Sequence, residues 1–371
     1  MIGVRAARGH LAAATPEPSQ ATGGMTMADR QERAAMLRAL DLAQSPGVPS
    51  HPNPRVGCVL LGPSGEIVGA GYHRGAGTAH AEVVAIAAAG ARARGATAVV
   101  TLEPCDHFGR TPPCTRALLQ AGVRRVVVAQ RDPHPRAAGG LERLAAAGVV
   151  VEAGLLVEEA IALNSRWTFA HTRRRPFVTW KLATTLDGRS AAADGSSRWV
   201  TSRAARDDVH RLRAHCDTIL VGTGTVQIDD PHLTVRHGFA AAGLPPLRAV
   251  MGTRPLAAER RVHDGAAATV RLRTRSPHEA LEALYREHDR HHVLLEGGPT
   301  LAASFLRAGL VDEVVAYVAP ALLGAGRAAV GDLGIGSIGD ALRLRPTDVT
   351  VIGSGDDTTI RITSAPIEKE R

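Results

Sequence analysis

Two stretches of the chain decide its fold, and they read His80-Ala81-Glu82 and Pro104-Cys105-Asp106-His107-Phe108-Gly109-Arg110-Thr111-Pro112-Pro113-Cys114. Together they offer one imidazole, two thiolates and one carboxylate. His80, Cys105 and Cys114 can fill three positions of a tetrahedral Zn²⁺ and leave the fourth position for water. Glu82 lies two residues beyond the imidazole, where it can carry protons while that water attacks an amine-bearing ring carbon. The pattern predicts hydrolytic removal of an amine.

The spacing of the two cysteines differs from the short form Pro-Cys-x-x-Cys, because eight residues separate Cys105 from Cys114. Pro112 and Pro113 stiffen the end of this longer loop and favour a helix that starts at Cys114, where a thiolate is stabilised. A closed zinc knot, or two buried cysteines without a metal, is the alternative. A closed knot needs a fourth protein ligand, and the two remaining cysteines, Cys58 and Cys216, do not form a second pair of this kind.

Length and composition set the class of protein. A chain of 371 residues is longer than one hydrophobic core usually organises, which favours two domains. We expect a flexible N-terminal extension over 1–29, with a start upstream of Met27 as one interpretation, and domains over 30–172 and 173–366. No apolar run reaches the roughly 20 residues of a membrane span, so no membrane partner is expected. Four cysteines are too few for a disulfide framework and indicate the reducing cytoplasm.

The charge pattern favours a small phosphorylated ligand over nucleic acid. The net charge is +8, but the arginines are spread along the chain and only three Trp, three Tyr and five Phe could stack on bases. Only Lys181 and Lys369 are lysines among 44 basic residues. Lys181 is therefore interpreted as a residue retained for its compact ammonium, although survival by chance is the alternative.

Hydrophobic periodicity and turn residues predict an α/β fold in both halves. In the first half the expected helices are 29–43, 80–94, 114–121 and 141–147, and the expected strands are 56–61, 67–71, 98–102, 125–129 and 149–151. In the second half the expected helices are 203–214 and 301–308, and the expected strands are 178–182, 218–221, 248–251, 293–295 and 313–318. The turn Glu296-Gly297-Gly298-Pro299-Thr300 leads from a strand into a helix, which suits a phosphate but also an ordinary tight loop.

Several motifs in order give the chain a resemblance, over about residues 27–365, to the bifunctional riboflavin-biosynthesis deaminase–reductases. Besides the two stretches quoted first, they are His51-Pro52-Asn53-Pro54-Arg55-Val56-Gly57, Lys181-Leu182, Leu186-Asp187-Gly188-Arg189, Trp199-Val200-Thr201-Ser202, Asp229-Asp230-Pro231 through Arg236, and Glu296-Gly297-Gly298-Pro299-Thr300. The resemblance implies a cytidine-deaminase-like α/β/α sandwich followed by a dihydrofolate-reductase-like α/β domain.

The resemblance also implies two consecutive reactions on phosphorylated pyrimidines. The first removes the 2-amino group of 2,5-diamino-6-ribosylamino-4(3H)-pyrimidinone 5′-phosphate, with His80, Cys105 and Cys114 on zinc and Glu82 as proton carrier. The second uses NADPH to reduce the ribosyl side chain to ribityl. The expected ligands of the pyrimidine and its ribose phosphate in the deaminase pocket are Asn53, His73, His107 and Arg110. For His73 and His107, a place in surface loops is the alternative.

In the second half the resemblance assigns two further sets of residues. NADPH is expected at Ala183, Trp199, Thr225, Asp229, Gly297, Gly298, Pro299, Thr300, Leu301, Ala302 and Ala303, and substrate at Ser197, Arg213, Leu233, Arg236 and Glu296. Arg213 and Arg236 can make forked bonds to the ribose phosphate. Lys181 is expected to orient or polarise the sugar as charge develops on oxygen during reduction. Asp187 either shares that site or caps a turn.

One loop departs from the family pattern, which usually reads Asp-Pro-Asn-Pro followed by Val-Ala-Gly-Lys-Gly. This chain has Asp132-Pro133-His134-Pro135 and then Arg136-Ala137-Ala138-Gly139-Gly140. Three other functions remain as alternatives: a nucleic-acid or nucleoside deaminase with an accessory nucleotide-binding domain, a protein in which zinc only stabilises the fold, and a reductase with a relic deaminase. The sequence leaves open whether the chain forms a homo-oligomer.

Overall fold

The computed structural model describes residues 26–49, 51–236, 238–239 and 244–367. The first helix, α1 (Met27–Ala43), begins two residues before the expected position because Thr26 and Asp29 form a capping box. Residues 27–29 are thus helical rather than part of the expected flexible extension, and the rest of that extension, up to residue 25, lies outside the described residues.

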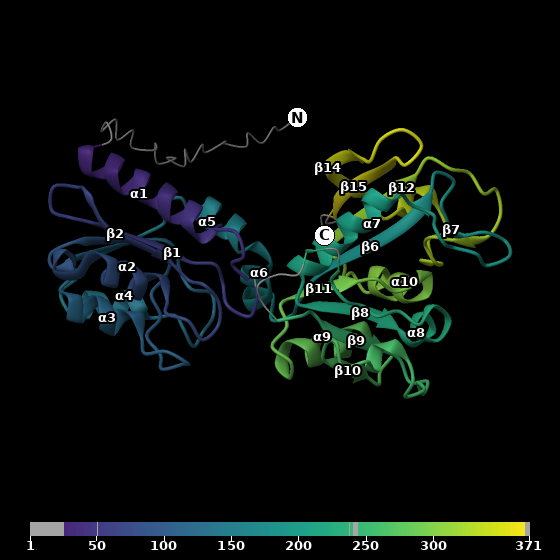
Figure 1. Cartoon of the computed structure of the whole chain (residues 1–371), viewed down its shortest axis with the longest axis horizontal. Helices are drawn as coiled ribbons and strands as arrows, with labels where there is room; N and C mark the ends of the chain where they lie inside the picture. The colour runs from purple at the N-terminus through teal and green to yellow at the C-terminus, as the bar shows by residue number, and fades with distance from the viewer. Residues whose placement is uncertain (1–25, 50, 237, 240–243, 368–371) are drawn as a thin grey trace, which may run out of the picture.

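A five-stranded sheet organises the first half (Figure 1). Its strand order is β2-β1-β3-β4-β5. The hairpin β1–β2 and the pair β1–β3 are antiparallel, whereas β3, β4 and β5 run parallel. The strands are β1 (Gly57–Leu61), β2 (Ile67–Tyr72), β3 (Thr97–Leu102), β4 (Arg125–Gln130) and β5 (Val150–Ala153). Parallel pairing brings the carboxyl ends of β3 and β4 to one edge, where loops carry functional groups in such sheets.

Helices cover both faces of this sheet, as the sequence predicts. Leu60 and Val100 on one face pack with α2 (Ala81–Ala89), α3 (Cys114–Ala121) and α4 (Gly140–Ala146). Val59 and Val99 on the other face pack with α1 and α5 (Val157–Leu163). The helix expected over 80–94 ends at Ala89 and continues only as the 3₁₀ turn η1 (Gly90–Ala93), because Gly90 adopts a φ of 57°.

The second half contains an eight-stranded mixed sheet in the order β10-β9-β8-β11-β6-β12-β15-β14. The strands from β10 to β12 run parallel, and β15 and β14 close the edge as an antiparallel hairpin. Its strands are β6 (Phe177–Thr185), β8 (Thr218–Gly222), β9 (Leu247–Met251), β10 (Thr269–Leu272), β11 (His292–Leu295), β12 (Glu313–Ala319), β14 (Leu344–Ile352) and β15 (Thr359–Pro366).

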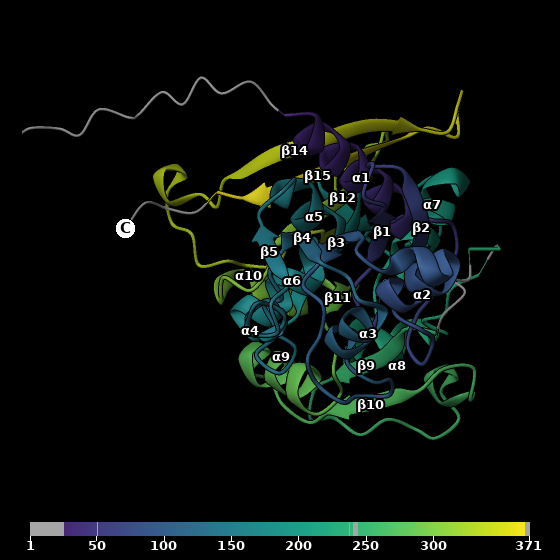
Figure 2. The same cartoon turned by 90° about the vertical axis from the view of Figure 1, so that its left-hand side faces the viewer.

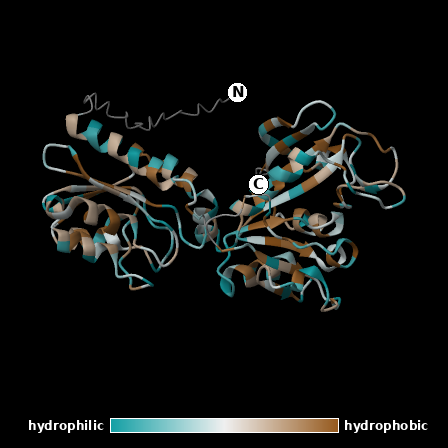
Figure 3. Cartoon of the chain, viewed as in Figure 1, coloured by the Kyte–Doolittle hydropathy of each residue, from teal (hydrophilic) through white to brown (hydrophobic). Residues whose placement is uncertain are grey.

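Helix α6 (Ser165–Arg173) lies between the two sheets (Figure 1). The remaining helices are α7 (Arg203–His215), α8 (Thr223–Asp229), α9 (Pro277–Arg286) and α10 (Pro299–Arg307), with 3₁₀ turns η2 (Arg261–His263) and η3 (Ile338–Asp340), and β7 (Arg189–Ala191) pairs with β13 (Arg327–Ala328). Figure 2 shows the first sheet and its helices from the side of α2 and α3. Apolar residues concentrate in the central strands of both sheets (Figure 3).

The expected α/β class is confirmed, but several elements of the second half are absent from the sequence prediction. The long hairpin β14–β15 and the helices α8 and α9 are the main ones. β14 is largely exposed, so no buried apolar run marks it. Among the helices of the described residues, none combines the length and apolar character needed to cross a membrane.

A close backbone contact links the start of α4 to the metal-binding stretch. A Cβ added at Gly140 would lie 1.8 Å from the carbonyl oxygen of Pro104, the residue before Cys105. Glycine therefore allows α4 to approach the end of β3.

We expect Gly140→Ala to lower the free energy of unfolding by about 1–3 kcal/mol, because the methyl group forces the two backbones apart. Urea unfolding followed by circular dichroism measures this change. Gly336→Ala is the matched control, since its Cβ would meet nothing within 4 Å. Equal stability of both variants and the unchanged chain would contradict the packing argument.

Candidate active sites

The three predicted metal ligands come together in the structure. Nδ1 of His80 lies 3.1 Å from Sγ of Cys114 and 3.6 Å from Sγ of Cys105, and all three ligand atoms lie within 4.8 Å of one another. Tetrahedral Zn²⁺ with ordinary N and S bond lengths separates such ligands by about 3.5 Å. The donor set and its geometry therefore fit zinc with one position left for water.

Two helix starts and one strand end position these ligands. His80 is the N-cap of α2, Cys114 is the first residue of α3, and Cys105 follows β3. A hydrogen bond from the Cys114 thiol lowers the pKa of Cys105 to about 4, with a further contribution from His80. One sulfur is thus a thiolate at neutral pH, which is the form that binds a metal.

Thr111 orients the imidazole, and the sequence analysis did not single it out. Its Oγ1 lies 3.1 Å from Nε2 of His80. With Nδ1 as the metal ligand, Nε2 carries the proton and donates a hydrogen bond to the Thr111 hydroxyl. Only the position of Thr111 three residues before Cys114 could have drawn attention to it.

Glu82 lies in the first turn of α2 with a side chain that is almost fully buried. Burial raises its pKa above the ordinary value, and the neighbouring His80 charge opposes that effect. A carboxyl group with a raised pKa exchanges a proton more readily near neutral pH.

His80, Glu82, Cys105 and Thr111 line one cavity of about 350 Å³, a size suited to a small organic ligand. Asn53, His73, His107 and Arg110 line the same cavity. His73 is buried and bonds to Nδ2 of Asn53 at 2.9 Å, so its alternative as a surface histidine is wrong. His107 and Arg110 are exposed and lie at the rim.

Further residues line the cavity: Glu103, Asp132, His134, Trp167, His171, Asp289 and His291. Glu103 belongs to the motif around Cys105 and Asp132 and His134 belong to the altered loop, whereas the other four come from segments that the sequence analysis did not connect with the metal motifs. Glu103 anchors the altered loop, because its two carboxylate oxygens accept the backbone N–H groups of Asp132, Gly139 and Leu141, each at 3.1 Å. Burial raises the pKa of Asp132 to about 7, while the N–H of His134 opposes this rise.

In the second half, Lys181 and Glu296 face each other at the carboxyl edge of the sheet. Trp180 of β6 pairs in register with Leu295 of β11, so the next residues on each strand are neighbours. Burial lowers the pKa of Lys181, and the Glu296 charge partly restores it. Burial alone would raise the pKa of Glu296, but Arg213 and Lys181 hold it at about 2.

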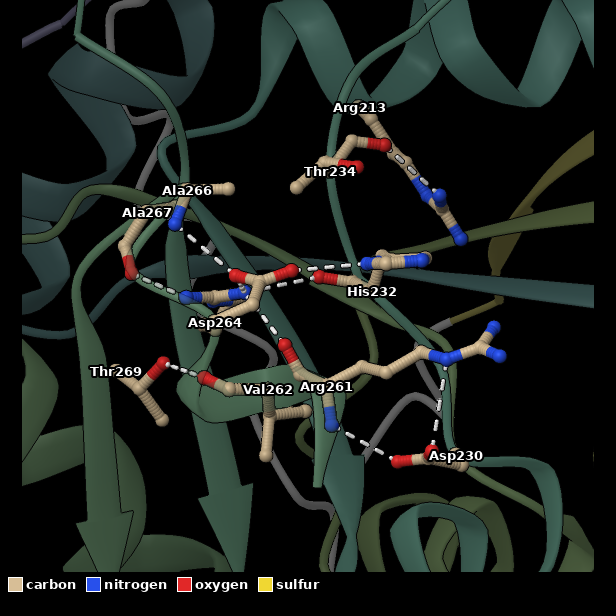
Figure 4. A network of polar contacts seen from close by, with 11 residues as sticks. Arg213, Asp230, His232, Thr234, Arg261, Val262, Asp264, Ala266, Ala267 and Thr269 are labelled. Atoms are coloured by element: carbon tan, nitrogen blue, oxygen red, sulfur yellow. Dashed lines mark hydrogen bonds and ion pairs between the residues drawn. The ribbon is translucent and has the colours of Figure 1, made fainter. Parts of the chain in front are cut away.

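The sequence analysis expected the Arg213 guanidinium to make forked bonds to the ribose phosphate. In the structure this guanidinium is already bonded within the protein. Its Nε and Nη2 bond to the two oxygens of Glu296 at 2.6 and 2.8 Å. Nη1 donates to the carbonyl of Thr234 at 3.0 Å (Figure 4). A guanidinium fork matches the two oxygens of a carboxylate, so Glu296 occupies the donors that a phosphate would need.

The segment after α8, which carries Leu233 and Arg236, is fixed by the network in Figure 4. Asp264 accepts hydrogen bonds from Nη1 of Arg248 at 2.7 Å and from Nδ1 of His232 at 2.9 Å. The Arg248 bond is the main reason that the pKa of Asp264 is well below its usual range. Leu233 is buried in a small core, so only its backbone can meet substrate, whereas the Arg236 side chain is exposed.

Most of the predicted cofactor residues lie in β6, in α8 and in the turn and helix that follow β11. Thr225 lies in α8 directly after β8, Ala183 lies in β6, and the run from Gly297 to Ala303 spans the turn after β11 and the first part of α10. A Cβ at Gly298 would meet only Oγ1 of Thr225, at 4.0 Å, which leaves room for a ligand there. Asp229 and Ser197 are exposed, and Trp199 is 70% exposed with the Arg206 guanidinium 4.3 Å from its ring.

The fold and the two sites define a bifunctional enzyme, a zinc-type deaminase joined to a reductase, and family comparisons agree. The model of the cytidine and deoxycytidylate deaminase zinc-binding region matches residues 29–130. The model of the RibD C-terminal domain matches residues 176–356. The chain belongs to the RibD family of deaminase–reductases of riboflavin biosynthesis. The predicted cytidine-deaminase-like and reductase folds are thereby confirmed.

Relatives support this assignment over most of the chain. The riboflavin biosynthesis protein RibD of Mycobacterium tuberculosis is 52% identical over 82% of this chain and 89% of its own length. Acinetobacter baumannii RibD has a solved structure with a TM-score of 0.84 at 36% identity, covering 91% of this chain and 99% of that one. Another solved structure has a TM-score of 0.76 at 31% sequence identity and covers 91% of this chain and 99% of its own. It is the diaminohydroxyphosphoribosylaminopyrimidine deaminase/5-amino-6-(5-phosphoribosylamino)uracil reductase of Thermotoga maritima.

We expect Thr111→Val to weaken zinc binding about 10- to 100-fold, because it removes the hydrogen bond that fixes the His80 tautomer while keeping the side-chain shape. Competition with a chromogenic chelator measures the affinity. Thr111→Ser retains the hydroxyl and is the control. If the valine variant bound zinc as tightly as the serine variant, Thr111 would have no part in orienting His80.

Proposed function

We propose that the first half deaminates 2,5-diamino-6-ribosylamino-4(3H)-pyrimidinone 5′-phosphate and that the second half reduces the ribosyl side chain of the product with NADPH. The observation that carries this proposal is the cavity lined by buried Glu82, His80 and Cys105, with Cys114 completing the cluster of ligand atoms. The name of the Thermotoga relative supports the substrate class. The boundary between the deaminase domain and the reductase domain is proposed at residues 172–173. The four free cysteines support a cytoplasmic location.

In the deaminase site, Zn²⁺ held by His80, Cys105 and Cys114 would supply Lewis acidity to a water molecule. Glu82 would take one proton from the attacking water and deliver it to the ring nitrogen, and then take the second proton from the new hydroxyl and deliver it to the departing amine. The C–O bond forms and the C–N bond breaks, so water and the amine yield a carbonyl and ammonia. Asn53 and His73 orient the pyrimidine, while His107 and Arg110 at the rim meet the ribose phosphate.

In the reductase site, bound NADPH would supply the hydride. Lys181 donates a hydrogen bond to the sugar oxygen on which negative charge develops. Glu296 keeps this ammonium beside the substrate, and Arg213 holds Glu296 and the Thr234 segment in place. Arg236 is left with an exposed guanidinium and takes the phosphate. The remaining assignments from the resemblance, including Ser197, Leu233 and the cofactor residues, are proposed unchanged.

The decisive experiment supplies the diaminopyrimidinone phosphate with and without NADPH and identifies the products by mass. We expect the deaminated ribosyl compound without NADPH and the ribityl compound with it. No mass change under either condition would rule out the proposed substrate.

We expect Glu82→Gln to retain one zinc per chain and to lose deamination, because an amide of the same size cannot carry a proton. Ammonia release and metal analysis measure the two properties. Cys105→Ser is the companion variant: it should lose the metal site and deamination, yet still reduce deaminated substrate. Near-normal deamination by Glu82→Gln would overturn the assigned proton carrier.

We expect Lys181→Arg to lose hydride transfer almost as completely as Lys181→Ala, on the order of 10²-fold or more. A planar guanidinium cannot replace a compact ammonium beside Glu296. NADPH affinity should change less than turnover, because the contact is strongest in the transition state. Single-turnover absorbance at the nicotinamide band and NADPH titration measure both quantities. Normal turnover by Lys181→Arg would show that lysine occurs there by chance.

A further inference from the structure

The deaminase cavity is not built from the first half alone. Asp289 and His291, which lie between α9 and β11, line it together with His80 and Glu82. His171 of α6 bridges the two parts, with its ring 4.6 Å from that of His291. The second half therefore forms part of the wall around the deaminase site.

His51 connects the same region to the substrate side of the cavity. Its Nδ1 lies 3.1 Å from Oδ2 of Asp217, just before β8. Its Nε2 lies 2.9 Å from Nη1 of Arg290. Because a guanidinium can only donate, Nε2 accepts and Nδ1 carries the proton, close to the carboxylate but outside hydrogen-bond geometry. Both partners of His51 belong to the second half.

Asp217 is itself firmly held. Its Oδ2 accepts the backbone N–H groups of His291 at 2.7 Å and His292 at 2.9 Å, and Oδ1 accepts the Thr218 hydroxyl at 2.9 Å. Burial would raise the pKa of Asp217, but its close contact with His51 and the hydrogen bond from the backbone N–H of His291 lower it to about 2. His51 thus lies against a carboxylate that is charged and held in place.

Two residues beyond His51, Asn53 enters the cavity and bonds to His73 at 2.9 Å. Pro52 and Pro54 restrict the backbone on either side. A displacement at His51 is therefore transmitted to the amide of Asn53, and misplacement of a substrate contact by about 1 Å can cost 10²-fold in activity.

We propose that the second half positions the deaminase site through His51, which acts as a positioning residue for Asn53. This inference rests on the deaminase function proposed above and adds a dependence of one site on the other half of the chain. The contacts of His51 with the second half should then affect the binding of the deaminase substrate and leave hydride transfer in the second half unaffected.

A metal at His51, Asp217 and His291 is the competing interpretation, since their donor atoms lie within 4.8 Å of one another. Two contacts oppose it. The Arg290 guanidinium bonded to His51 repels a cation, and Oδ2 of Asp217 is already shared by two backbone N–H groups. We therefore expect one zinc per chain, at the deaminase site.

The test compares the full chain with His51→Ala, His51→Asn and Arg290→Ala. We expect His51→Ala to raise the deaminase KM about tenfold or more, with kcat changed less, while hydride transfer on deaminated substrate stays within twofold. His51→Asn keeps a donor where Nδ1 was and should recover part of the KM. The double variant His51→Ala/Arg290→Ala should be no worse than His51→Ala alone, because both remove the same link. His278→Ala, on the exposed side of α9, is the matched control.

Each other outcome contradicts the positioning role. An unchanged deaminase KM in His51→Ala would show that Asn53 needs no anchor. Equal loss of both activities, with a lower unfolding temperature, would assign His51 to general stability. A zinc content that falls from two to one in His51→Ala would establish the metal site instead. If the unchanged chain does not deaminate the substrate, the proposed function fails independently of His51.

Discussion

The approach of one imidazole nitrogen to two sulfurs is the constraint on which the first half depends. His80 and Cys114 stand at the starts of two helices, and Cys105 follows a buried strand, so both helices must begin at the same edge of the sheet. Gly140 lets α4 close on that edge because its hydrogen leaves room for the carbonyl of Pro104. The packing of the helices on the first sheet therefore also determines the geometry of the metal ligands.

The two sites use the same carboxylic acid in opposite ways, and their surroundings decide which. Glu82 is buried, and the effect of burial outweighs that of the neighbouring His80 charge, so its pKa rises and it can exchange protons. Glu296 is also buried but bonds to Arg213 and faces Lys181, so it stays ionised and acts as a fixed charge. Environment rather than residue type separates a proton carrier from an electrostatic anchor.

The sequence predicts those parts of the molecule that local spacing determines. The metal ligands, Glu82 and the alternation of strands and helices follow from short motifs, and the structure brings the ligands together. Thr111, Asp289 and His291 could not be predicted, since their contacts depend on how distant segments pack. Arg213 shows the same limit: its residue type suggested a phosphate ligand, but its fork is occupied by Glu296, 83 residues further along the chain. The exposed strand β14 lacks the apolar pattern that reveals buried strands.

Glu103 holds the loop over 132–140 entirely through backbone N–H groups. Such an anchor does not involve the side chain of residue 134, so that residue can differ while the three hydrogen bonds persist; Gly140, by contrast, is restricted by the carbonyl of Pro104. His134, where the family usually carries asparagine, is such a change, and its ring lies 4.7 Å from that of His171 beside the cavity. An inhibitor that engages this pair of imidazoles would gain contacts that do not depend on the zinc ligands, which makes position 134 a place to seek selectivity.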